Sequence, residues 1–298
     1  MAGGDSIVNI KRKTTTIATY VAVGLLLAWT LGPLVWMFIS SIAPSQTLLD
    51  RTSPWFPAHP TFERYYSILI APLMVYHGTV ISSPGAVFRH SILNSLAVTS
   101  VTTALSLVVG GVAAYAFARL DFRMKKPMLY LAMFLQLVPP IALVIPFYFM
   151  IRAAGMIDRL STLIILNMSF VLAYVIWVLN GYFKTIPREL ESAARIDGCS
   201  RFGAFIRVIL PNAAPGFVAV GALSFLLCWD EFLFALIFTN SLQSKTIPVA
   251  ISEFSTQFGI DYGMMMTGGV LTTLIPLVLA LVFQRYIISG LTTGALKA

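Results

Sequence analysis

Charged residues are scarce in this sequence. Only 11% of the 298 residues are Asp, Glu, Lys or Arg, whereas 58% are hydrophobic, and a soluble domain carries roughly 25% charged residues. So few polar side chains argue against a soluble enzyme, and so many apolar ones exclude a disordered chain. Cysteine is scarce too: Cys199 and Cys228 supply neither a disulfide framework nor the ligand spacing of a zinc site.

Long apolar runs dominate what remains. A helix needs about 20 mostly apolar residues to cross a bilayer, and six segments are long enough: 16–42, 92–118, 128–151, 160–183, 205–239 and 264–288. Prolines interrupt the third segment at Pro139-Pro140 and the start of the fifth at Pro211 and Pro215, so we expect breaks there. The sequence therefore predicts an all-α membrane protein with six transmembrane helices.

The basic residues predict an orientation. Lys and Arg outnumber Asp and Glu by twenty to twelve, for a net charge of +8, and such residues gather in cytoplasmic loops. With the N-terminus inside, six cations lie outside and fourteen lie in the cytoplasm, namely Lys11, Arg12, Lys13, Arg119, Arg123, Lys125, Lys126, Lys184, Arg188, Arg195, Arg201, Arg207, Arg285 and Lys297. We therefore predict an N-in/C-in topology and no binding to nucleic acid.

These spans define a simple organisation. A cytoplasmic N-terminal segment at 1–15 precedes a single six-helix membrane domain at 16–298. That domain carries a charged cytoplasmic loop at 184–204, between the fourth and fifth spans, and two outer loops at 43–91 and 240–263.

The loop 184–204 holds the clearest helical signal outside the spans. Pro187 suits the first turn of a helix, Glu189 and Glu191 favour the positive end of its dipole, and Gly198 is a stop signal. Ser200 can cap the next helical run. We predict a short helix over 187–197, a turn, and a second helix that enters the membrane.

One face of this short helix is predicted to meet a surface. The residues that recur at i, i+3, i+4 and i+7 are Leu190, Ala193, Ala194 and Asp197. Two alanines on one face allow close approach to another protein. The alternative is a helix that lies on lipid headgroups with its apolar face in the bilayer.

The same segment resembles a known family. Ala193-Ala194, Gly198 and Leu210-Pro211 stand at the spacing of the EAA loop of ATP-binding-cassette importer permeases. The Ala-Arg-Ile-Asp-Gly form is similar to the carbohydrate-importer branch, in particular the smaller of its two permeases, the MalG-like type. Leu-Asn-Ser at 93–95 and the closing Phe-Gln-Arg-Tyr at 283–286 also match. The resemblance covers about residues 14–298.

One residue departs from the family pattern. The Glu of Glu-Ala-Ala falls at position 192, where this sequence has Ser192. Glu191 is adjacent but points about 100° away around a helix. Either Glu191 partly substitutes for the missing carboxylate, or this loop makes a weaker polar contact with its partner.

The resemblance implies a cytoplasmic coupling helix that docks on an ATPase. Its ATPase-coupling residues are Glu191, Ser192, Ala193, Ala194, Asp197, Gly198, Leu210 and Pro211. The implied partners are a second, MalF-like permease, an ATPase dimer, an extracytoplasmic solute-binding protein and membrane lipid, in a bacterial plasma (inner) membrane. The chain itself is then not an enzyme: it has no catalytic residues, no metal and no cofactor. It lacks a phosphate-binding Gly-x-x-x-x-Gly-Lys-Ser/Thr loop, so ATP and Mg belong to the partner ATPase.

Polar residues inside the spans are candidates for the translocation pathway. They are Trp229, Asp230, Glu231, Gln136 and Asn167, and charges in a span usually face a partner or a wet cavity. The alternative is structural, with hydrogen bonds that hold helices together. In the outer loop 240–263 the resemblance implies contact with the binding protein, and the candidate residues are Asn240, Gln243, Lys245 and Gln257.

Two other functions compete with an importer permease. The first is a stand-alone transporter driven by protons, with Asp230 or Glu231 as proton carrier, although no inverted repeat supports it. The second is a membrane-embedded enzyme, for which these two adjacent acids make a poor dyad because they point to different helix faces. The identity of the solute, beyond a carbohydrate or related compound, is not encoded in any motif.

Overall fold

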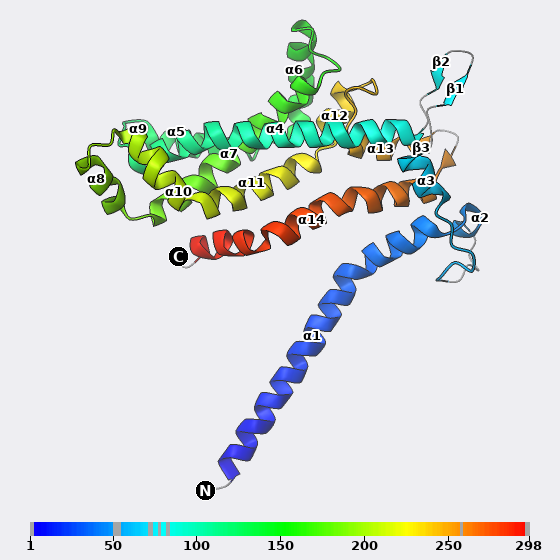
Figure 1. Cartoon of the computed structure of the whole chain (residues 1–298), viewed down its shortest axis with the longest axis horizontal. Helices are drawn as coiled ribbons and strands as arrows, with labels where there is room; N and C mark the ends of the chain where they lie inside the picture. The colour runs from blue at the N-terminus through cyan, green and yellow to red at the C-terminus, as the bar shows by residue number, and fades with distance from the viewer. Residues whose placement is uncertain are drawn as a thin grey trace. The chain divides into compact units, whose positions relative to one another are not determined.

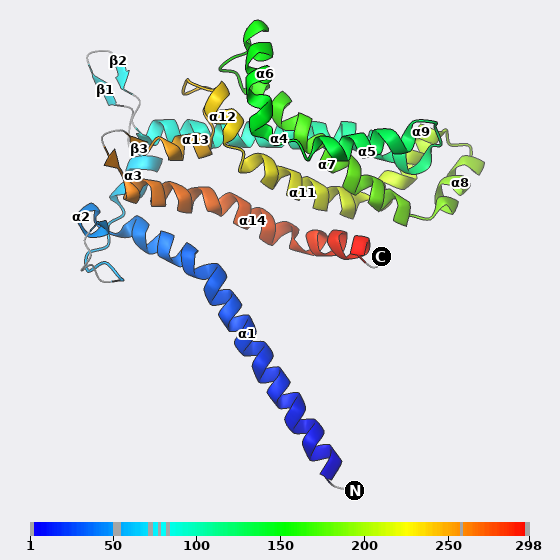
Figure 2. The same ribbon diagram turned by 180° about the vertical axis from the view of Figure 1, so that it is seen from behind.

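The structure is a computed structural model of the whole chain. It describes residues 3–49, 55–70, 74–76, 79–81, 84–256 and 259–295, with side chains over 15–49, 55–70, 85–255 and 260–286. The chain divides into two compact units: unit 1 comprises 1–70 and 254–271, and unit 2 comprises 71–253 and 272–298. Both units are almost entirely helical in the described residues (Figures 1 and 2).

Unit 1 begins with the longest helix and ends within the last one. Its elements are α1 (Gly3–Ile42), α2 (Ser45–Leu48), α3 (Glu63–Leu69), a short hairpin of β3 (Ser255–Thr256) and β4 (Gly259–Ile260), and the first part of α14 (Tyr262–Ala295). The hairpin is antiparallel, with Ser255 opposite Ile260.

Unit 2 holds most of the helices and the remainder of α14. A second antiparallel hairpin joins β1 (Met74–Tyr76) and β2 (Thr79–Ile81). The helices are α4 (Pro84–Arg119), α5 (Lys125–Leu135), α6 (Pro140–Ala153), α7 (Leu160–Thr185), α8 (Arg188–Ile196), α9 (Arg201–Ala204), the π-helical turn η1 (Phe205–Ile209), α10 (Leu210–Asn212), α11 (Ala214–Trp229), α12 (Leu233–Phe238) and α13 (Ile247–Ser252).

The described residues contain four to six candidate membrane spans. Four continuous helices are long and apolar enough: Thr15–Ile42, Gly85–Arg119, Leu160–Thr185 and Tyr262–Tyr286. They correspond to the predicted first, second, fourth and sixth spans. Two bent pairs qualify only when each is taken together, α5 with α6 at 96° and α9–α10 with α11 at 75°. The segments predicted as the third and fifth spans therefore each contain two helices that meet at a sharp bend.

Proline chemistry explains both breaks. Pro139 is extended, with φ −60° and ψ 128°, because the ring of Pro140 excludes the helical region for the residue before it, and Pro140 then begins α6. In the fifth segment Pro211 offers no N–H to the carbonyl of Arg207, and the chain widens there into η1. That segment also breaks a second time, at 230–232 between α11 and α12, which the prediction of one run over 205–239 missed.

The core of unit 2 lies between α4, α7 and α11, which run side by side in both views (Figures 1 and 2). One buried cluster joins Ala114, Val175, Leu179, Phe183 and Val220. Helices α4 and α7 approach each other closely at Gly110 of α4. A Cβ atom at that position would lie only 2.6 Å from Cγ1 of Val175, so only glycine fits without a shift. This close packing makes α4 and α7 one rigid pair.

A buried arginine organises unit 1. Arg64 of α3 is 8% exposed and donates hydrogen bonds to the carbonyl oxygens of Ser41 at 3.1 Å and Ala43 at 2.7 Å. These carbonyls lie at the C-terminal end of α1. The last carbonyls of a helix have no N–H donor within the helix, and the negative end of the helix dipole favours a cation there. Gly263 lies against the same guanidinium, and a Cβ there would be 2.1 Å from its Cζ.

Replacing Gly110 with alanine tests the packing of α4 on α7. We expect Gly110→Ala to lower the free energy of unfolding by about 1–3 kcal/mol, because the added methyl overpacks the contact with Val175. Gly181→Ala is the matched control, since a Cβ at that position would meet no atom within 4 Å and alanine favours a helix. The measurement is the melting temperature in lipid nanodiscs, and equal values for the two variants would contradict the packing argument.

Candidate functional site

The loop between α7 and α9 folds as the sequence predicts. Helix α8 spans Arg188–Ile196 with Pro187 as its N-cap and two acids in its first turn, which confirms the predicted helix over 187–197. Gly198 has φ +89°, a left-handed conformation that an L side chain rarely adopts, and so ends the helix. Ser200 caps α9, and its hydroxyl oxygen accepts a 3.1 Å hydrogen bond from the N–H of Gly203.

The inward side of α8 is held by the C-terminal end of α4. The hydroxyl of Tyr115 donates a 2.8 Å hydrogen bond to Glu191 Oε1, and Nε of Arg119 lies 3.7 Å from Glu191 Oε2. Arg119 also donates a 2.6 Å hydrogen bond to the carbonyl of Ile186, directly before α8. The side chains of Arg119 and Glu191 are only 4% and 12% exposed, so this ion pair is sheltered. We call Tyr115, Arg119 and Glu191 the α8 anchor.

The outward side of α8 presents apolar and small residues. Ile196 is 85% exposed and Leu190 40%, and Ser192, Ala193 and Asp197 are exposed to differing degrees as well. Ala194 instead is 7% exposed, packed inside the protein. The predicted common face of Leu190, Ala193, Ala194 and Asp197 is therefore divided between two sides of the helix.

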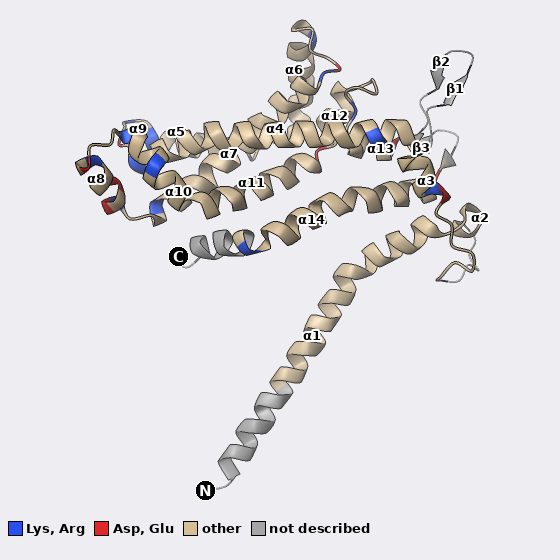
Figure 3. Cartoon of the chain, in the orientation of Figure 1, with Lys and Arg blue, Asp and Glu red and all other residues tan. Residues whose placement is uncertain are grey.

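Leu210 and Pro211 belong to the turns that follow α8. Leu210 is half-buried against the core cluster, while Pro211 is exposed. Phe205 of η1 lies beneath the α8 anchor, its ring centroid 4.6 Å from that of Tyr115, and α8 and η1 are in contact. Helix α8 is therefore joined to the core of unit 2 through aromatic packing. Figure 3 shows Lys and Arg gathered at this end of unit 2, around α8, α9 and the start of α5.

A cleft of about 660 Å³ collects three of the five predicted pathway residues. Gln136 reaches it from the end of α5, Asn167 from α7 and Glu231 from the break after α11. The remaining lining is mostly apolar and aromatic and includes Phe170 and Tyr174. The cleft can thus offer amide groups and ring faces to a ligand, which is the usual composition of a small-molecule site.

The other two predicted pathway residues lie elsewhere. Trp229 is 2% exposed and stacks on Phe225 with ring centroids 5.7 Å apart, so it packs in the protein. Asp230 is exposed but does not line the cleft. Glu231 has a structural role beside its place in the cleft, because its carboxylate accepts hydrogen bonds from the N–H groups of Phe234 at 2.6 Å and Ala235 at 3.1 Å. It caps the first turn of α12.

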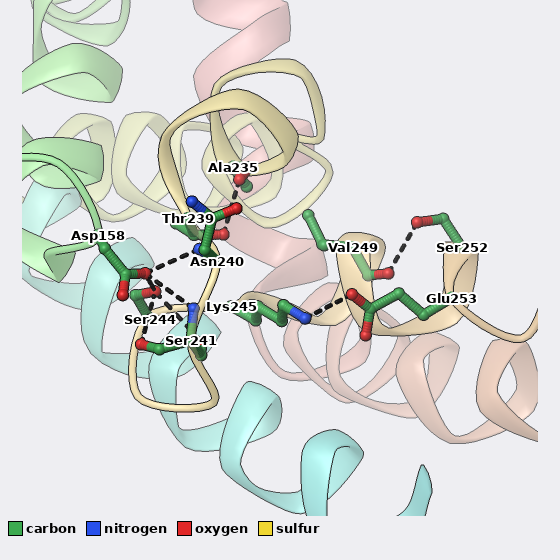
Figure 4. A network of polar contacts seen from close by, with 10 residues as sticks. All are labelled: Asp158, Ala235, Thr239, Asn240, Ser241, Ser244, Lys245, Val249, Ser252 and Glu253. Atoms are coloured by element: carbon green, nitrogen blue, oxygen red, sulfur yellow. Dashed lines mark hydrogen bonds and ion pairs between the residues drawn. The ribbon is translucent and has the colours of Figure 1, made fainter. Parts of the chain in front are cut away.

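The loop after α12 is fixed by residues from two other elements, of which Figure 4 shows Asp158. Asp158, in the connection between α6 and α7, accepts hydrogen bonds from the backbone N–H groups of Asn240 at 2.7 Å and Ser241 at 2.9 Å and from the hydroxyl of Ser244. From α4, the Asn94 side chain donates to the carbonyl oxygens of Leu242 at 3.2 Å and Lys245 at 2.9 Å. The loop is therefore a defined turn.

Of the four residues predicted to contact a binding protein, three lie in this loop. Asn240 and Gln243 are exposed. Lys245 forms a 2.5 Å ion pair with Glu253, so its charge is neutralised within the protein. Gln257 lies outside the described residues.

The carboxyl of Asp158 is held ionised. Burial raises its pKa, but the hydrogen bonds from Asn240, Ser241 and Ser244 outweigh burial and lower the pKa to about 2. A lowered pKa contributes stability that is present above the ordinary value of 3.8 and is lost as the pH falls through about 2. The turn is therefore insensitive to pH over the neutral and mildly acidic range.

Sequence reasoning misses the residues that hold these sites in place. Tyr115 and Arg119 stand at the end of a predicted span, and nothing in the sequence indicates that they bind Glu191. Asp158 stands in a short connection between two predicted spans. A signal exists for Asp158, because an acid between two apolar spans is a candidate for capping a neighbouring loop. No sequence signal links positions 158 and 240, which meet only in the fold.

A family model described as "Binding-protein-dependent transport system inner membrane component" matches residues 106–293. The chain is 36% identical over 284 residues to the trehalose transport system permease protein SugB of Mycobacterium tuberculosis, covering 94% of this chain and 98% of that protein. It is 33% identical to the trehalose/maltose transport system permease protein MalG of Thermococcus litoralis, covering 90% and 91%.

Among solved structures, the fold is similar to a chain of a bacterial ABC transporter involved in the import of the acidic polysaccharide alginate. The TM-score is 0.73 at 20% identity, and the match covers 93% of this chain and 97% of that one. A chain of the MetNI methionine ABC transporter matches with a TM-score of 0.55 at 18% identity, covering 68% and 96%.

The α8 anchor can be tested by removing its carboxylate. We expect Glu191→Ala to lower the free energy of unfolding by about 1–3 kcal/mol, because the sheltered Arg119 guanidinium and the Tyr115 hydroxyl both lose a partner. Amide hydrogen exchange over 186–198 should rise as well. Glu189→Ala removes an exposed carboxylate from the same helix and serves as the control. If both variants exchange alike, the anchor does not hold α8.

Proposed function

Because this chain belongs to the family of binding-protein-dependent transport system inner membrane components, we propose that it forms half of the translocation pathway of an ATP-binding-cassette importer for a carbohydrate or related solute. One observation carries the mechanism: α8 presents an exposed apolar surface while its other side is held by the sheltered Arg119–Glu191 pair. A helix held in this way can pass a movement of a partner into the membrane bundle.

The partner at α8 is an ATPase subunit. The exposed Ile196 and Leu190, beside Ser192 and Ala193, provide a small apolar knob with a polar rim, which suits a groove on another protein. ATP and Mg bind to the ATPase dimer and not to this chain, whose sequence has no phosphate-binding loop. A second, MalF-like permease completes the pathway.

The missing motif glutamate has a specific consequence. Glu191 is engaged with Tyr115 and Arg119 inside the protein, so it does not substitute outward for the carboxylate absent at 192. The Ser192 hydroxyl donates a 3.3 Å hydrogen bond to the carbonyl of Arg188 in its own helix. The contact with the ATPase at this permease therefore rests mainly on apolar packing around Ile196.

The pathway passes through the 660 Å³ cleft. Side-chain amides of Gln136 and Asn167 can hydrogen-bond hydroxyl groups, and the rings of Phe170 and Tyr174 can pack on the apolar face of a sugar. Trehalose, named for one relative, and trehalose or maltose, named for another, support a carbohydrate as the solute class. An extracytoplasmic solute-binding protein delivers it to the outer loop that contains Asn240 and Gln243.

The topology follows from the spans and the charges. Four continuous candidate spans, together with two bent pairs that each count as one span, support six crossings, and we propose that both termini lie in the cytoplasm. Basic residues concentrated around α8, α9 and the start of α5 (Figure 3) support a cytoplasmic location for that end of unit 2.

Reconstitution tests the function as a whole. We expect the chain to co-purify with an ATPase dimer and a second permease, and to import solute into liposomes only with ATP and the binding protein. Transport by this chain alone, driven by a proton gradient without ATP, would overturn the proposal in favour of a secondary transporter.

The role of the apolar knob can be tested at one residue. We expect Ile196→Arg to reduce binding-protein-stimulated ATP hydrolysis about tenfold or more, because a charge at the centre of a packed interface is costly. Ile196→Leu, which keeps an apolar side chain of similar size, should retain most of the activity. Both variants must be compared as assembled complexes. Normal stimulation in the arginine variant would show that α8 does not dock through this residue.

The topology can be tested with cysteine labelling in intact cells. In a C199S/C228A background, Gln243→Cys should react with a membrane-impermeant maleimide, because we place the 240–263 loop outside. Met124→Cys, which is 56% exposed between α4 and α5, should react only after permeabilisation. Labelling of position 124 in intact cells would reverse the orientation.

A further inference from the structure

We propose that Asp158 is a positioning residue. It holds residues 239–246, the turn between α12 and α13 that begins the outer loop, in the conformation in which this turn meets the solute-binding protein. The identity of that partner rests on the proposed function, whereas the contacts that fix the loop do not. Asp158 is remote from the loop in sequence and belongs to the short connection between α6 and α7.

A single carboxylate oxygen accepts hydrogen bonds from three residues of the loop. Asp158 Oδ1 accepts from the N–H groups of Asn240 at 2.7 Å and Ser241 at 2.9 Å and from the hydroxyl of Ser244 (Figure 4). The N–H of Asp158 in turn donates a 2.9 Å hydrogen bond to the carbonyl of Phe238, the last residue of α12. The connection and the loop are therefore joined in both directions, by side chain and by backbone.

The backbone at Asp158 is shaped for this contact. Its φ is +63°, in the left-handed region that costs most side chains roughly 1–2 kcal/mol but that Asp and Asn tolerate best. Residues stay in such a conformation where the surroundings fix it. Here the left-handed turn allows the N–H and the carboxylate of one residue to reach the same loop.

The far end of the loop is held independently. Asn94 of α4 donates to the carbonyls of Leu242 and Lys245, and the Ser95 hydroxyl accepts a 2.9 Å hydrogen bond from the N–H of Ile247. With its backbone bound at both ends, the loop leaves the side chains of Asn240 and Gln243 exposed.

This arrangement suits the docking of a preformed polar surface. A loop that is already ordered loses less conformational entropy when a partner binds, and so binds it more tightly. Lys245 is neutralised by Glu253 at 2.5 Å, so the exposed contacts are two uncharged amides. Such groups recognise a partner by hydrogen-bond geometry and not by long-range charge.

Hydrogen exchange on the full chain in lipid nanodiscs tests the structural part without any partner. In Asp158→Ala the amides of Asn240 and Ser241 lose their acceptor, and we expect their exchange to accelerate about tenfold or more, which corresponds to about 1.4 kcal/mol. In Asp158→Asn one oxygen remains as an acceptor, so most of the protection should persist. Unchanged exchange in the alanine variant would overturn the role of Asp158.

Titration of the assembled importer tests the functional part. As the binding protein is added, Asp158→Ala should raise the concentration that gives half-maximal ATPase stimulation about tenfold or more, while basal ATPase activity stays at the wild-type level. Asp158→Asn should restore most of the response. The control Asp121→Ala removes a carboxylate that is 87% exposed at the end of α4 and should change neither quantity.

The possible outcomes separate the two proposals. Equal loss of basal and stimulated activity, with no shift in the half-maximal concentration, would make Asp158 a residue for folding only and overturn its positioning role. A wild-type importer that does not respond to any binding protein would overturn the proposed function, and the exchange experiment would still decide whether Asp158 holds the loop.

Discussion

The ion pair between Arg119 and Glu191 is the contact on which the position of α8 depends. By itself α8 is a nine-residue amphipathic helix, too short to be stable in isolation. With the ion pair, the helix is tied to the end of α4, and α4 is in turn packed against α7 through the close approach at Gly110. Helix α8 is therefore joined, through α4, to the packed core of unit 2.

At both ends of unit 2 a carboxylate holds a short segment in place. On one end a glutamate of a short helix is held by the Tyr and Arg of α4; on the other an aspartate of a short connection holds the turn after α12. In both cases a carboxylate joins segments far apart in the sequence, and α4 takes part at each end through Tyr115 and Asn94. Helix α4 thus takes part in holding both α8 and the loop after α12.

The spans and α8 were predictable from sequence because each depends on local physics. Apolar length predicts a membrane helix, and Pro187 and Gly198 delimit α8 through backbone chemistry. The second break at 230–232 was not predictable, because its apolar surroundings mask it and Glu231 acts there as a helix cap. Helical periodicity also placed Ala194 on the face of Leu190, whereas in the structure Ala194 is buried and Leu190 is exposed. The hydrogen bonds that hold α8 and the loop after α12 could not be predicted, since they join residues that are far apart in the sequence.

The division of α8 into an inner and an outer side has an evolutionary consequence. Glu191 and Ala194 secure the helix, whereas Ser192, Ala193 and Ile196 face away from that attachment. Because the left-handed turn at Gly198 sets the exit of the chain by backbone geometry, the outward residues can be exchanged without redesigning the joint. In the importer proposed above, a change at these few surface positions would alter which ATPase is recruited and would leave the attachment of α8 intact.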